Sequence, residues 1–421
     1  MVSIDSFNKS FQYQRSQMTQ KAQFTKKKFL GLGITSLIAT GVISTQALAS
    51  ADDISNALTS GTAYGDFRLR YEYVDQDNTL DSAKALTLRS RLGYNTGAYE
   101  GFSATMEFED SRVVADQDRY TTGGYSVIAD PETTELDQGY LQYKNDELTV
   151  KFGRQVLILD NHRFVGDVGW RQDRQTFDAL TINYKFSKDL QASYAYLGQR
   201  NRILAETADK NSKDKILNIS YSTGLGKLTA YSYLLEEDNG TDNSIDTFGL
   251  RFAGATDINE ELKALYTLEY AYQENEAAGN ALETNYMLVE GGLVFSGITA
   301  KLSYEVLGSK DGLIGFTTPL ATLHKFNGWA DQFLNTPNEG LSDLSVSFSG
   351  KLAGGKWLAV YHDFNADDSS VAVDDLGSEL DLSYSKGFGK NYSAGLKYAA
   401  YSAGDIKVDT DKVWLLLGAK F

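Results

Sequence analysis

The chain has 421 residues with a formal net charge of −16, and it contains no cysteine, 3 prolines, 26 tyrosines and 38 glycines. The lack of cysteine excludes disulfides and thiolate metal sites, and the acidic balance argues against nucleic acid as a partner. A mean hydropathy of −0.34, with no long apolar run after the first fifty residues, excludes a helical membrane protein.

The N-terminus has the order of a secretory signal peptide. Lys26–Lys28 is basic, Phe29–Ile43 is apolar, and Ala47–Ala49 provides an A-x-A cleavage site. A transmembrane anchor is the alternative, but an apolar run of about fifteen residues is short for one. We therefore predict that residues 1–49 are cleaved, with Met18 as a plausible true start. The remaining chain has 34 basic and 55 acidic residues, a net charge of −21.

From Thr62 onward the sequence repeats about ten residues of apolar/polar alternation followed by a break. Period-two alternation places polar side chains on one face of a strand and apolar side chains on the other. We predict one all-β domain over residues 50–421, an up-and-down antiparallel transmembrane β-barrel of about eighteen strands. The predicted strands begin near residues 62, 84, 101, 134, 147, 171, 190, 214, 226, 243, 261, 282, 298, 341, 355, 374, 391 and 410.

The connections between these strands alternate in length. Short ones such as Asn145–Asp146 and Ser296–Gly297 are typical of periplasmic turns, and longer polar ones are typical of extracellular loops. A soluble β-sandwich is the alternative, but it does not explain this alternation. The predicted long loops are 75–83, 115–133, 158–170, 203–213, 236–243, 274–281, 309–340, 365–373 and 403–409.

The last strand indicates closure and export to the outer membrane. Val413, Leu415, Leu417, Ala419 and Phe421 share one face, and the chain stops at that aromatic residue. A terminal aromatic on such a strand resembles the signal that delivers outer-membrane barrels to their insertion machinery. We therefore expect this machinery as a partner through Phe421, and outer-membrane lipid and lipopolysaccharide as further partners. Divalent cations would bridge the acidic outer loops to lipopolysaccharide.

The same alternation predicts which side chains face the lumen. Charges on the lipid face near mid-bilayer cost about 2–4 kcal/mol each, so charged positions must face inward. Eighteen strands enclose more space than side chains can fill, which indicates a water-filled lumen. The inward positions proposed to line the pore are Arg68, Arg70, Arg89, Arg91, Glu107, Lys151 and Arg251.

A second group of candidate pore residues lies between Val150 and Ile182, where the alternation gives way to a charged, aromatic loop. Clustered arginines and glutamines bind anions or sugars through their rigid donors, and aromatic rings offer flat faces. A solvated hairpin loop whose charges pair among themselves is the alternative. Arg154 is out of step with Lys151 unless a bulge intervenes. The candidates of this group are Arg154, Gln155, Arg163, Arg171 and Arg174.

Three parts of this stretch, Gly153–Gln155, Asp160–Gly166 and Gly169–Ala179, together resemble the signature of the alginate-export family of bacterial outer-membrane β-barrels. The resemblance covers roughly thirty positions and implies a channel for anionic or sugar-like solutes. A net charge of −21 and a lumen of both signs differ from what export of alginate itself would favour.

Two long loops are candidates for narrowing the pore. Arg163 and Phe164 of the 158–170 loop would tuck into the lumen. The 309–340 loop has apolar residues at roughly helical spacing over Leu320–Phe326. It would fold inward as a constriction, cap the mouth, or lie at the membrane interface, and the sequence leaves these three positions open.

The first hairpins lead to a hypothesis about selectivity. A hairpin folded symmetrically about residues 75–83 sets Arg68 opposite Arg91 and Arg70 opposite Arg89, and the next turn sets Glu107 opposite Arg89. Like charges directly opposite each other destabilise a sheet, so they need compensation. The residues form either a salt-bridge network that stiffens the wall or a positive ladder that favours anions.

Enzymatic and metal sites are not indicated. The three histidines lie far apart, and the acidic loops lack the spacing of a calcium-binding loop. We predict no cofactor and no catalytic residues. The expected function is passive diffusion of small hydrophilic solutes across the outer membrane of a Gram-negative cell. A plugged structural or adhesive barrel and an outer-membrane barrel enzyme are the alternatives.

Overall fold

The structure is a computed structural model that describes residues 51–116, 119–120, 123–277, 280–369 and 372–421. The predicted signal peptide, residues 1–49, lies entirely outside the described residues, as does its predicted cleavage site. Asp52–Phe421 form one compact unit. It begins with the short helix α2 (Ala51–Thr59), and the rest of the chain is almost entirely β-structure. Among the described residues, no helix is long and apolar enough to cross a membrane.

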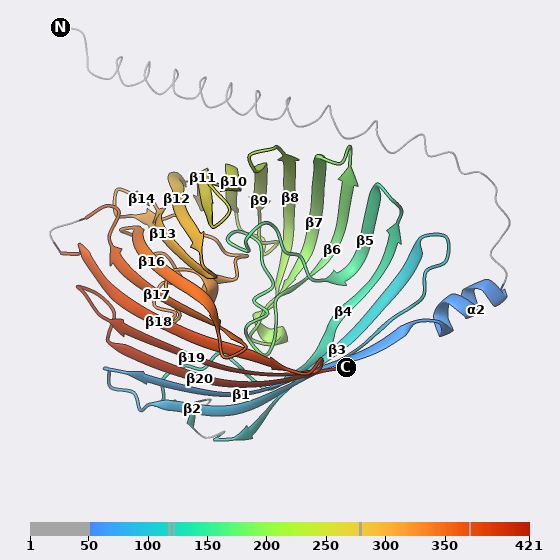
Figure 1. Ribbon diagram of the computed structural model, residues 1–421, viewed down its shortest axis with the longest axis horizontal. Helices are drawn as coiled ribbons and strands as arrows, with labels where there is room; N and C mark the ends of the chain where they lie inside the picture. Colours follow the sequence, from blue (N-terminus) through green and yellow to red (C-terminus); the bar gives the residue numbers. More distant parts are fainter. Residues whose placement is uncertain (1–50, 117–118, 121–122, 278–279, 370–371) are drawn as a thin grey trace, which may run out of the picture. The chain divides into compact units, whose positions relative to one another are not determined.

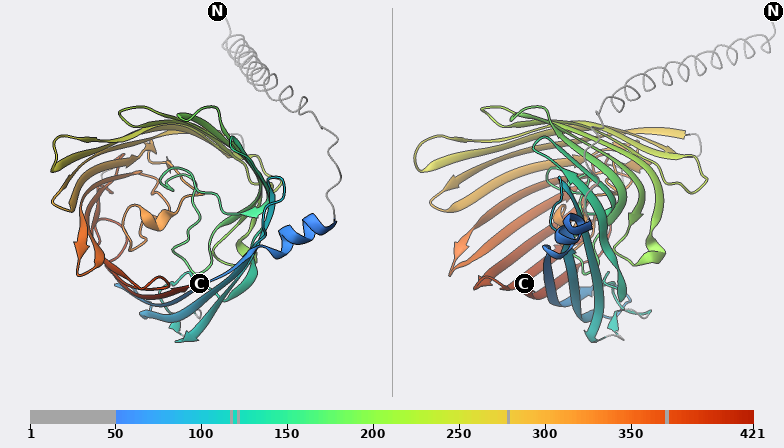
Figure 2. Two further views of the ribbon diagram at one scale, coloured as in Figure 1. Left: turned by 45° about the vertical axis from the view of Figure 1, so that its right-hand side comes forward. Right: turned by 90° about the vertical axis from the view of Figure 1, so that its right-hand side faces the viewer.

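Eighteen antiparallel strands form one closed sheet (Figures 1 and 2). Each strand pairs with its neighbours in sequence order, and β1 also pairs with β20, which closes the barrel. The strands are β1 (Thr62–Gln76), β2 (Ala83–Asn95), β3 (Phe102–Ala115), β4 (Thr133–Lys144), β5 (Leu148–Gln155), β6 (Thr176–Lys185), β7 (Leu190–Asn201), β8 (Lys210–Ser222), β9 (Lys227–Leu235), β10 (Asn243–Asp257), β11 (Leu262–Ala277), β12 (Asn280–Phe295), β13 (Ile298–Leu307), β16 (Leu341–Leu352), β17 (Gly355–Asn365), β18 (Asp375–Phe388), β19 (Tyr392–Ser402) and β20 (Thr410–Lys420).

The predicted fold class, strand number and approximate strand positions are confirmed. The largest differences at a strand start are β6, predicted near 171, and β8, predicted near 214. The predicted loop 274–281 is mostly strand, because β10 supports β11 as far as the pair Asn243 and Ala277. Closure continues to the last residue, since the N–H of Phe421 donates to the carbonyl of Gly65 over 2.9 Å.

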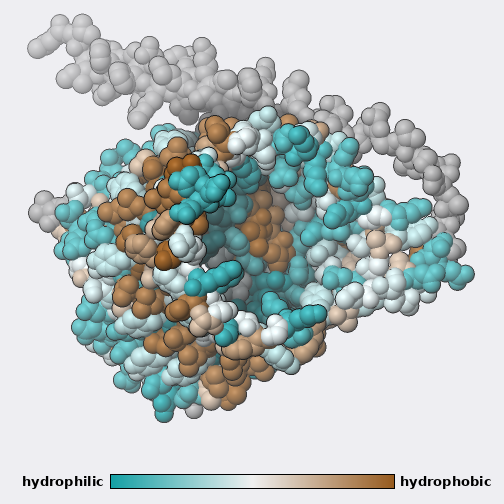
Figure 3. Space-filling model, in the orientation of Figure 1, coloured by the Kyte–Doolittle hydropathy of each residue, from teal (hydrophilic) through white to brown (hydrophobic). Residues whose placement is uncertain are grey.

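The wall has the expected two faces. Leu92, Phe102 and Leu417 are more than half exposed and point away from the lumen, whereas Arg70 and Glu72 of the opposite phase are buried. In the space-filling view, hydrophobic residues gather in a band over part of the outer wall, and the centre of the molecule is hollow (Figure 3). The apolar band suits lipid, and the buried polar phase lies on the lumen side.

The predicted registers of the first two hairpins are wrong by a few residues. Arg68 pairs with Arg89, and Arg91 pairs with Glu109. In the second hairpin, Glu100 and Gly101 have φ values of 49° and 86°, so the turn is tight and centred on them. Two consecutive residues with positive φ favour a two-residue hairpin turn. This turn lies later in the chain than the midpoint assumed from the sequence, and its position sets the register.

Candidate functional site

Two loops fold into the lumen and contact each other there. We name residues 156–175 the first lumen segment and residues 308–340 the second lumen segment; both lie inside the barrel (Figure 2, left). Val165 and Leu320 form a parallel β-bridge, and the N–H of Gly166 donates to the carbonyl of Leu320 over 2.8 Å. The sequence left three positions open for the second lumen segment: inside the lumen, over the mouth, or at the membrane interface. The structure shows the first of these.

An apolar cluster holds both segments against the barrel wall. The ring of Phe164 lies 5.1 Å from that of Tyr231, 5.3 Å from that of Tyr286 and 6.0 Å from that of Phe316. Phe316 and Leu320 of the second segment are fully buried in the same cluster. Burying one such side chain stabilises a fold by about 1.5–3 kcal/mol, so the cluster favours docked segments.

Arg163 joins the two segments to the wall through a polar contact. Its Nε donates to Glu305 on β13 over 2.8 Å, and its Nη2 donates to Asn327 of the second segment over 3.1 Å. The guanidinium lies 4.8 Å above the ring of Phe326. Its side chain is 1% exposed, so the ion pair is buried. Burial lowers the pKa of Arg163, but the charges of Glu305 and Tyr286 and the hydrogen bonds with them together raise it above its ordinary value.

Trp170 anchors the first segment on the opposite side of the lumen. Its ring stacks on His324 of the second segment at 3.8 Å, with an angle of 5° between the planes. The guanidinium of Arg70 on β1 lies 4.7 Å from the same ring. Nearby, Arg171 donates to Glu72 on β1 over 3.2 Å and to Asp331 of the second segment over 3.1 Å.

Lys397 on β19 contacts this cluster without a carboxylate partner among the described residues. Its Nζ lies 3.8 Å from the ring of Trp329 and 5.2 Å from that of Trp414, and it contacts His324 Nε2 at 2.7 Å. Burial lowers the pKa of His324 to about 3, so the ring is neutral near neutral pH. Nδ1–H then donates to Asp331 over 2.6 Å, and Nε2 accepts from Lys397.

The predicted arginine ladder is largely paired with acids. Of the ladder residues, Arg70, Arg89 and Arg91 each have a carboxylate within ion-pair distance, as does Arg174 of the first lumen segment, and all four side chains are mostly buried. This geometry resembles the salt-bridge network of the sequence hypothesis more than a free ladder. The pairs are Arg70 with Glu72 and Asp130, Arg89 with Asp66, Arg91 with Glu109 and Asp137, and Arg174 with Glu107 and Asp137.

Arg68 is different from the other ladder arginines. It donates to Gln172 Oε1 and to the carbonyl of Gly169, both over 3.0 Å, and to the carbonyl of Arg171. No carboxylate of the described residues lies within ion-pair distance of it. Arg68 therefore holds the backbone of the first lumen segment and adds a positive charge that no acid neutralises.

The remaining predicted residues divide between lumen and wall. The Nζ of Lys151 lies 4.5 Å from the ring of Tyr140, and Arg251 pairs with Glu269 at 2.5 Å. Gln155 is 1% exposed and donates to the carbonyl of Ala179 over 3.0 Å, so it closes the end of β5 rather than facing solvent.

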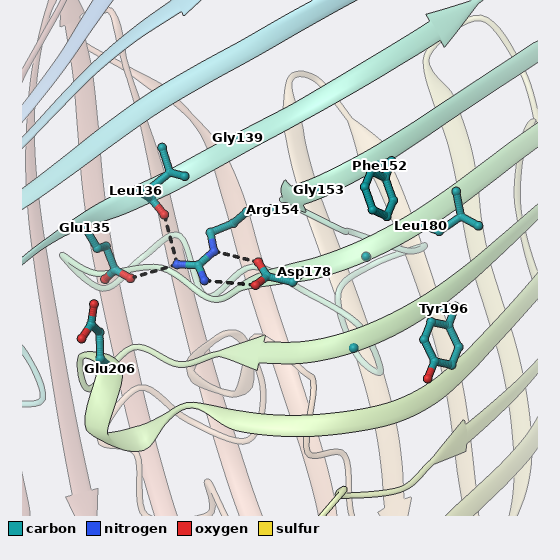
Figure 4. A pocket seen from close by; sticks show the side chains of 12 residues that line it. Glu135, Leu136, Gly139, Phe152, Gly153, Arg154, Asp178, Leu180, Tyr196 and Glu206 are labelled. Atoms are coloured by element: carbon teal, nitrogen blue, oxygen red, sulfur yellow. Dashed lines mark hydrogen bonds and ion pairs between the residues drawn. The ribbon is translucent and has the colours of Figure 1, made fainter.

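Arg154 lies on the outer face of the wall, which corrects the expectation that it lines the pore. It pairs with Gly139 and Asp178 in the register and therefore shares the face of Phe152, which is 67% exposed. Gly153 has a φ of 123°, so the strand is distorted just before Arg154. Arg154 donates to both oxygens of Asp178, over 2.7 and 3.2 Å, at the edge of an outer groove of about 600 Å³ (Figure 4).

Lys325 is a lumen residue that the sequence did not single out. It is exposed, and its Nζ donates to the carbonyl of Asn161 over 2.9 Å. Partial desolvation of the ammonium group and the nearby positive charges of Arg251 and Lys301 lower its pKa. Its place in the apolar stretch at helical spacing was visible in the sequence, but the direction of that loop was not.

Within the described residues, no group of three or more histidine, aspartate and glutamate side chains is arranged to hold a metal ion.

Comparison with known proteins agrees with this architecture. A family model described as alginate export matches residues 62–302. No curated protein sequence matches the chain. Pseudomonas aeruginosa OccK9 (OpdG) has a similar structure, with a TM-score of 0.70 and 13% identity over 87% of this chain and 99% of that one. Acinetobacter baumannii OccAB4 has a TM-score of 0.70 and 12% identity over 87% and 99%. Pseudomonas aeruginosa OpdK with vanillate has a TM-score of 0.68 and 11% identity over 85% and 98%.

The closed eighteen-stranded barrel with a polar lumen belongs to the class of outer-membrane channels for small solutes. Because the family model covers more than half of the chain, the protein belongs to the alginate export family.

Proposed function

We propose that the protein is a passive diffusion channel whose constriction is formed by the two lumen segments. The observation that carries this proposal is that charged side chains facing the lumen keep contact with solvent. Lys325 is exposed, and Lys151, Arg251 and Lys301 are half-buried. Charges at these depths require water around them, which a fully packed barrel would not provide.

Small hydrophilic anions are the solutes that this lumen favours. Arg251 pairs with Glu269 and Lys301 with Glu290, so these pairs add little net charge. Arg68, Lys151 and Lys325 have no carboxylate partner among the described residues. Uncompensated cations in a pore lower the barrier for anions, and salt screens the acidic outer loops over about 8–10 Å.

Single-channel recording tests both parts of the proposal. Purified protein in a planar bilayer should show steady open steps, and a salt gradient should give a zero-current potential of the sign that anion passage requires. Lys325→Gln should move this potential toward zero. Lys188→Gln is the matched control, because Lys188 is a 90% exposed side chain in a short turn. Unchanged selectivity in Lys325→Gln would contradict the assigned role of Lys325.

A plugged barrel is the second candidate, favoured by the apolar cluster that both segments form inside the wall. Protein that inserts into the bilayer but stays silent would support it. The enzyme alternative has no support from the family, and hydrolysis of lipid or peptide by purified protein would be needed to revive it.

Export, insertion and membrane partners complete the proposal. We propose that signal-peptide cleavage leaves a mature chain starting near Ser50, which N-terminal sequencing of protein extracted from outer membranes would test. Recovery of residues 1–49 would contradict cleavage. Phe421 would deliver the chain to the insertion machinery, and the acidic outer loops would bind lipopolysaccharide through divalent cations.

A further inference from the structure

A pocket of about 310 Å³ lies at the long-loop end of the barrel, between the second lumen segment and the ends of β7, β8 and β11. Long loops of such barrels are extracellular, so we name it the mouth pocket. It adjoins a second space of about 260 Å³ that shares Arg200 and Asn275 with it. The charged side chains that line it are Arg200, Arg202, Lys210 and Glu237, and Asn275 adds an amide.

Arg202 contributes a guanidinium that is held in place but only partly used. Its Nη1 donates to Gln175 Oε1 over 2.8 Å and to the carbonyl of Pro319 over 3.0 Å. These bonds fix the group against both lumen segments. Among the described residues, the Nε and Nη2 atoms of Arg202 have no hydrogen-bond acceptor. Neither atom is buried, so both reach solvent. No carboxylate of the described residues lies within ion-pair distance of Arg202.

The neighbouring cations show what Arg202 lacks. Arg200 uses the same two nitrogens, Nε and Nη2, to bind both oxygens of Asp214 over 2.8 and 2.7 Å. Lys210 pairs with Glu237 at 2.6 Å. Burial, followed by the nearby charge of Arg200, lowers the pKa of Arg202 by more than the charges of Glu237 and Asp209 raise it. One positive charge in the pocket therefore remains uncompensated.

The rest of the lining is neutral. Asn275, Thr317 and Asn335 supply hydrogen-bonding groups, and Leu323 and Leu334 supply apolar surface. A carboxylate fits the side of a guanidinium that offers Nε and Nη2, because two parallel N–H···O bonds form there. Such a pocket suits one small organic anion with hydroxyl groups or a short apolar part.

We propose that the mouth pocket is a binding site for a single small carboxylate, with Arg202 as the residue that recognises it. This inference rests on the proposed channel function, since the site would load solute before the constriction. Discrimination against a neutral analogue follows from the unpaired charge.

Solute binding can be measured as saturable block of a small-ion current, using glucuronate and glucose as probes that differ by the carboxylate. In wild type, glucuronate should block with a lower half-maximal concentration than glucose. Arg202→Gln should raise that concentration for glucuronate at least tenfold and leave glucose unchanged.

A second variant covers the case in which Arg202→Gln loosens the lumen segments. Asn275→Asp keeps the shape of the side chain and places a carboxylate in the pocket, so it should also weaken glucuronate block at least tenfold. Asn211→Asp is the matched control, because Asn211 is exposed on the other face of β8. If glucuronate blocks the currents of Asn275→Asp and Asn211→Asp at the same half-maximal concentration while both variants conduct, the mouth pocket is not the site. If wild type does not conduct at all, the channel function itself is wrong.

Discussion

Arg163→Met should release the first lumen segment while leaving the barrel intact. The substitution keeps much of the apolar stem but removes the guanidinium from Glu305, whose side chain is 9% exposed. Breaking a buried ion pair by removing one partner costs about 3–5 kcal/mol. That cost corresponds to a shift of about 10²- to 10⁴-fold in the equilibrium between docked and released segments.

Two contacts moderate this effect. Glu305 still accepts from the hydroxyl of Tyr286 over 2.6 Å and from Asn327 over 2.7 Å, so the lower end of the range is expected. The Phe164 cluster also stays in place. We therefore expect segment release to be frequent and transient. The strand ladders are untouched, so the barrel should still migrate as folded protein on an unboiled detergent gel.

Single-channel recording provides the assay. Arg163→Met should show larger mean conductance and more frequent steps between open levels than wild type. Arg163→Met combined with Glu305→Gln removes the unpaired charge and should partly restore quiet traces. Arg112→Met is the control, since the Arg112–Asp110 pair is exposed and such pairs contribute at most about 1 kcal/mol. Quiet traces of wild-type size in Arg163→Met would refute the anchoring role.

Three further predictions concern insertion, the wall and pH. Deleting Phe421 should lower the folded fraction in the outer membrane, and an unchanged unboiled band would show that the C-terminal signal is misread. Gly153→Ala should lower the temperature at which the folded gel band disappears, because φ is 123° and the new Cβ would lie 2.3 Å from the carbonyl oxygen of Gly139; Gly291→Ala, in open space, should not. Burial lowers the pKa of His324 from its ordinary value of 6.5 to about 3. Between pH 6.5 and pH 3, His324 therefore binds more protons when the second lumen segment is undocked than when it is docked. Docking should therefore be fully stable above about pH 6.5 and weaken as pH falls toward 3, by up to about 1.4 kcal/mol per pH unit. Conductance fluctuations measured from pH 7 to pH 4 should rise in wild type, and equal pH dependence in His324→Gln would show that another group titrates.

The strands were predictable because each one carries its own period-two pattern, independent of distant contacts. Registers depend instead on where the turn sits, and the Glu100–Gly101 turn moved Arg91 opposite Glu109. Arg154 was predicted to face the lumen, which would have needed a bulge between Lys151 and Arg154. The pairing of β5 with β4 and β6 continues through Gly153 without a register shift, so Arg154 stays on the outer face with Phe152.

The lumen segments could not be positioned from the sequence, since their contacts join residues far apart in the chain. Arg163 and Glu305 are separated by 142 residues, and Gln175 and Leu320 by 145. The sequence showed that Arg163, Trp170 and Arg171 cluster with aromatic residues. It did not show that their partners come from β1, β13 and the second lumen segment.

The charge of the lumen does not follow the charge of the chain. Most acids that face inward are paired with arginines of the wall or of the first lumen segment, as in Arg91 with Glu109. The acidic excess therefore resides chiefly in solvated connections, where salt screens it. Arg68, Arg202, Lys325 and Lys397 remain without a carboxylate partner among the described residues, although the chain carries 56 acids and 40 bases. An acidic outer-membrane barrel can in this way present a positive path to a solute, because pairing within the wall, and not composition, determines which charges the solute meets.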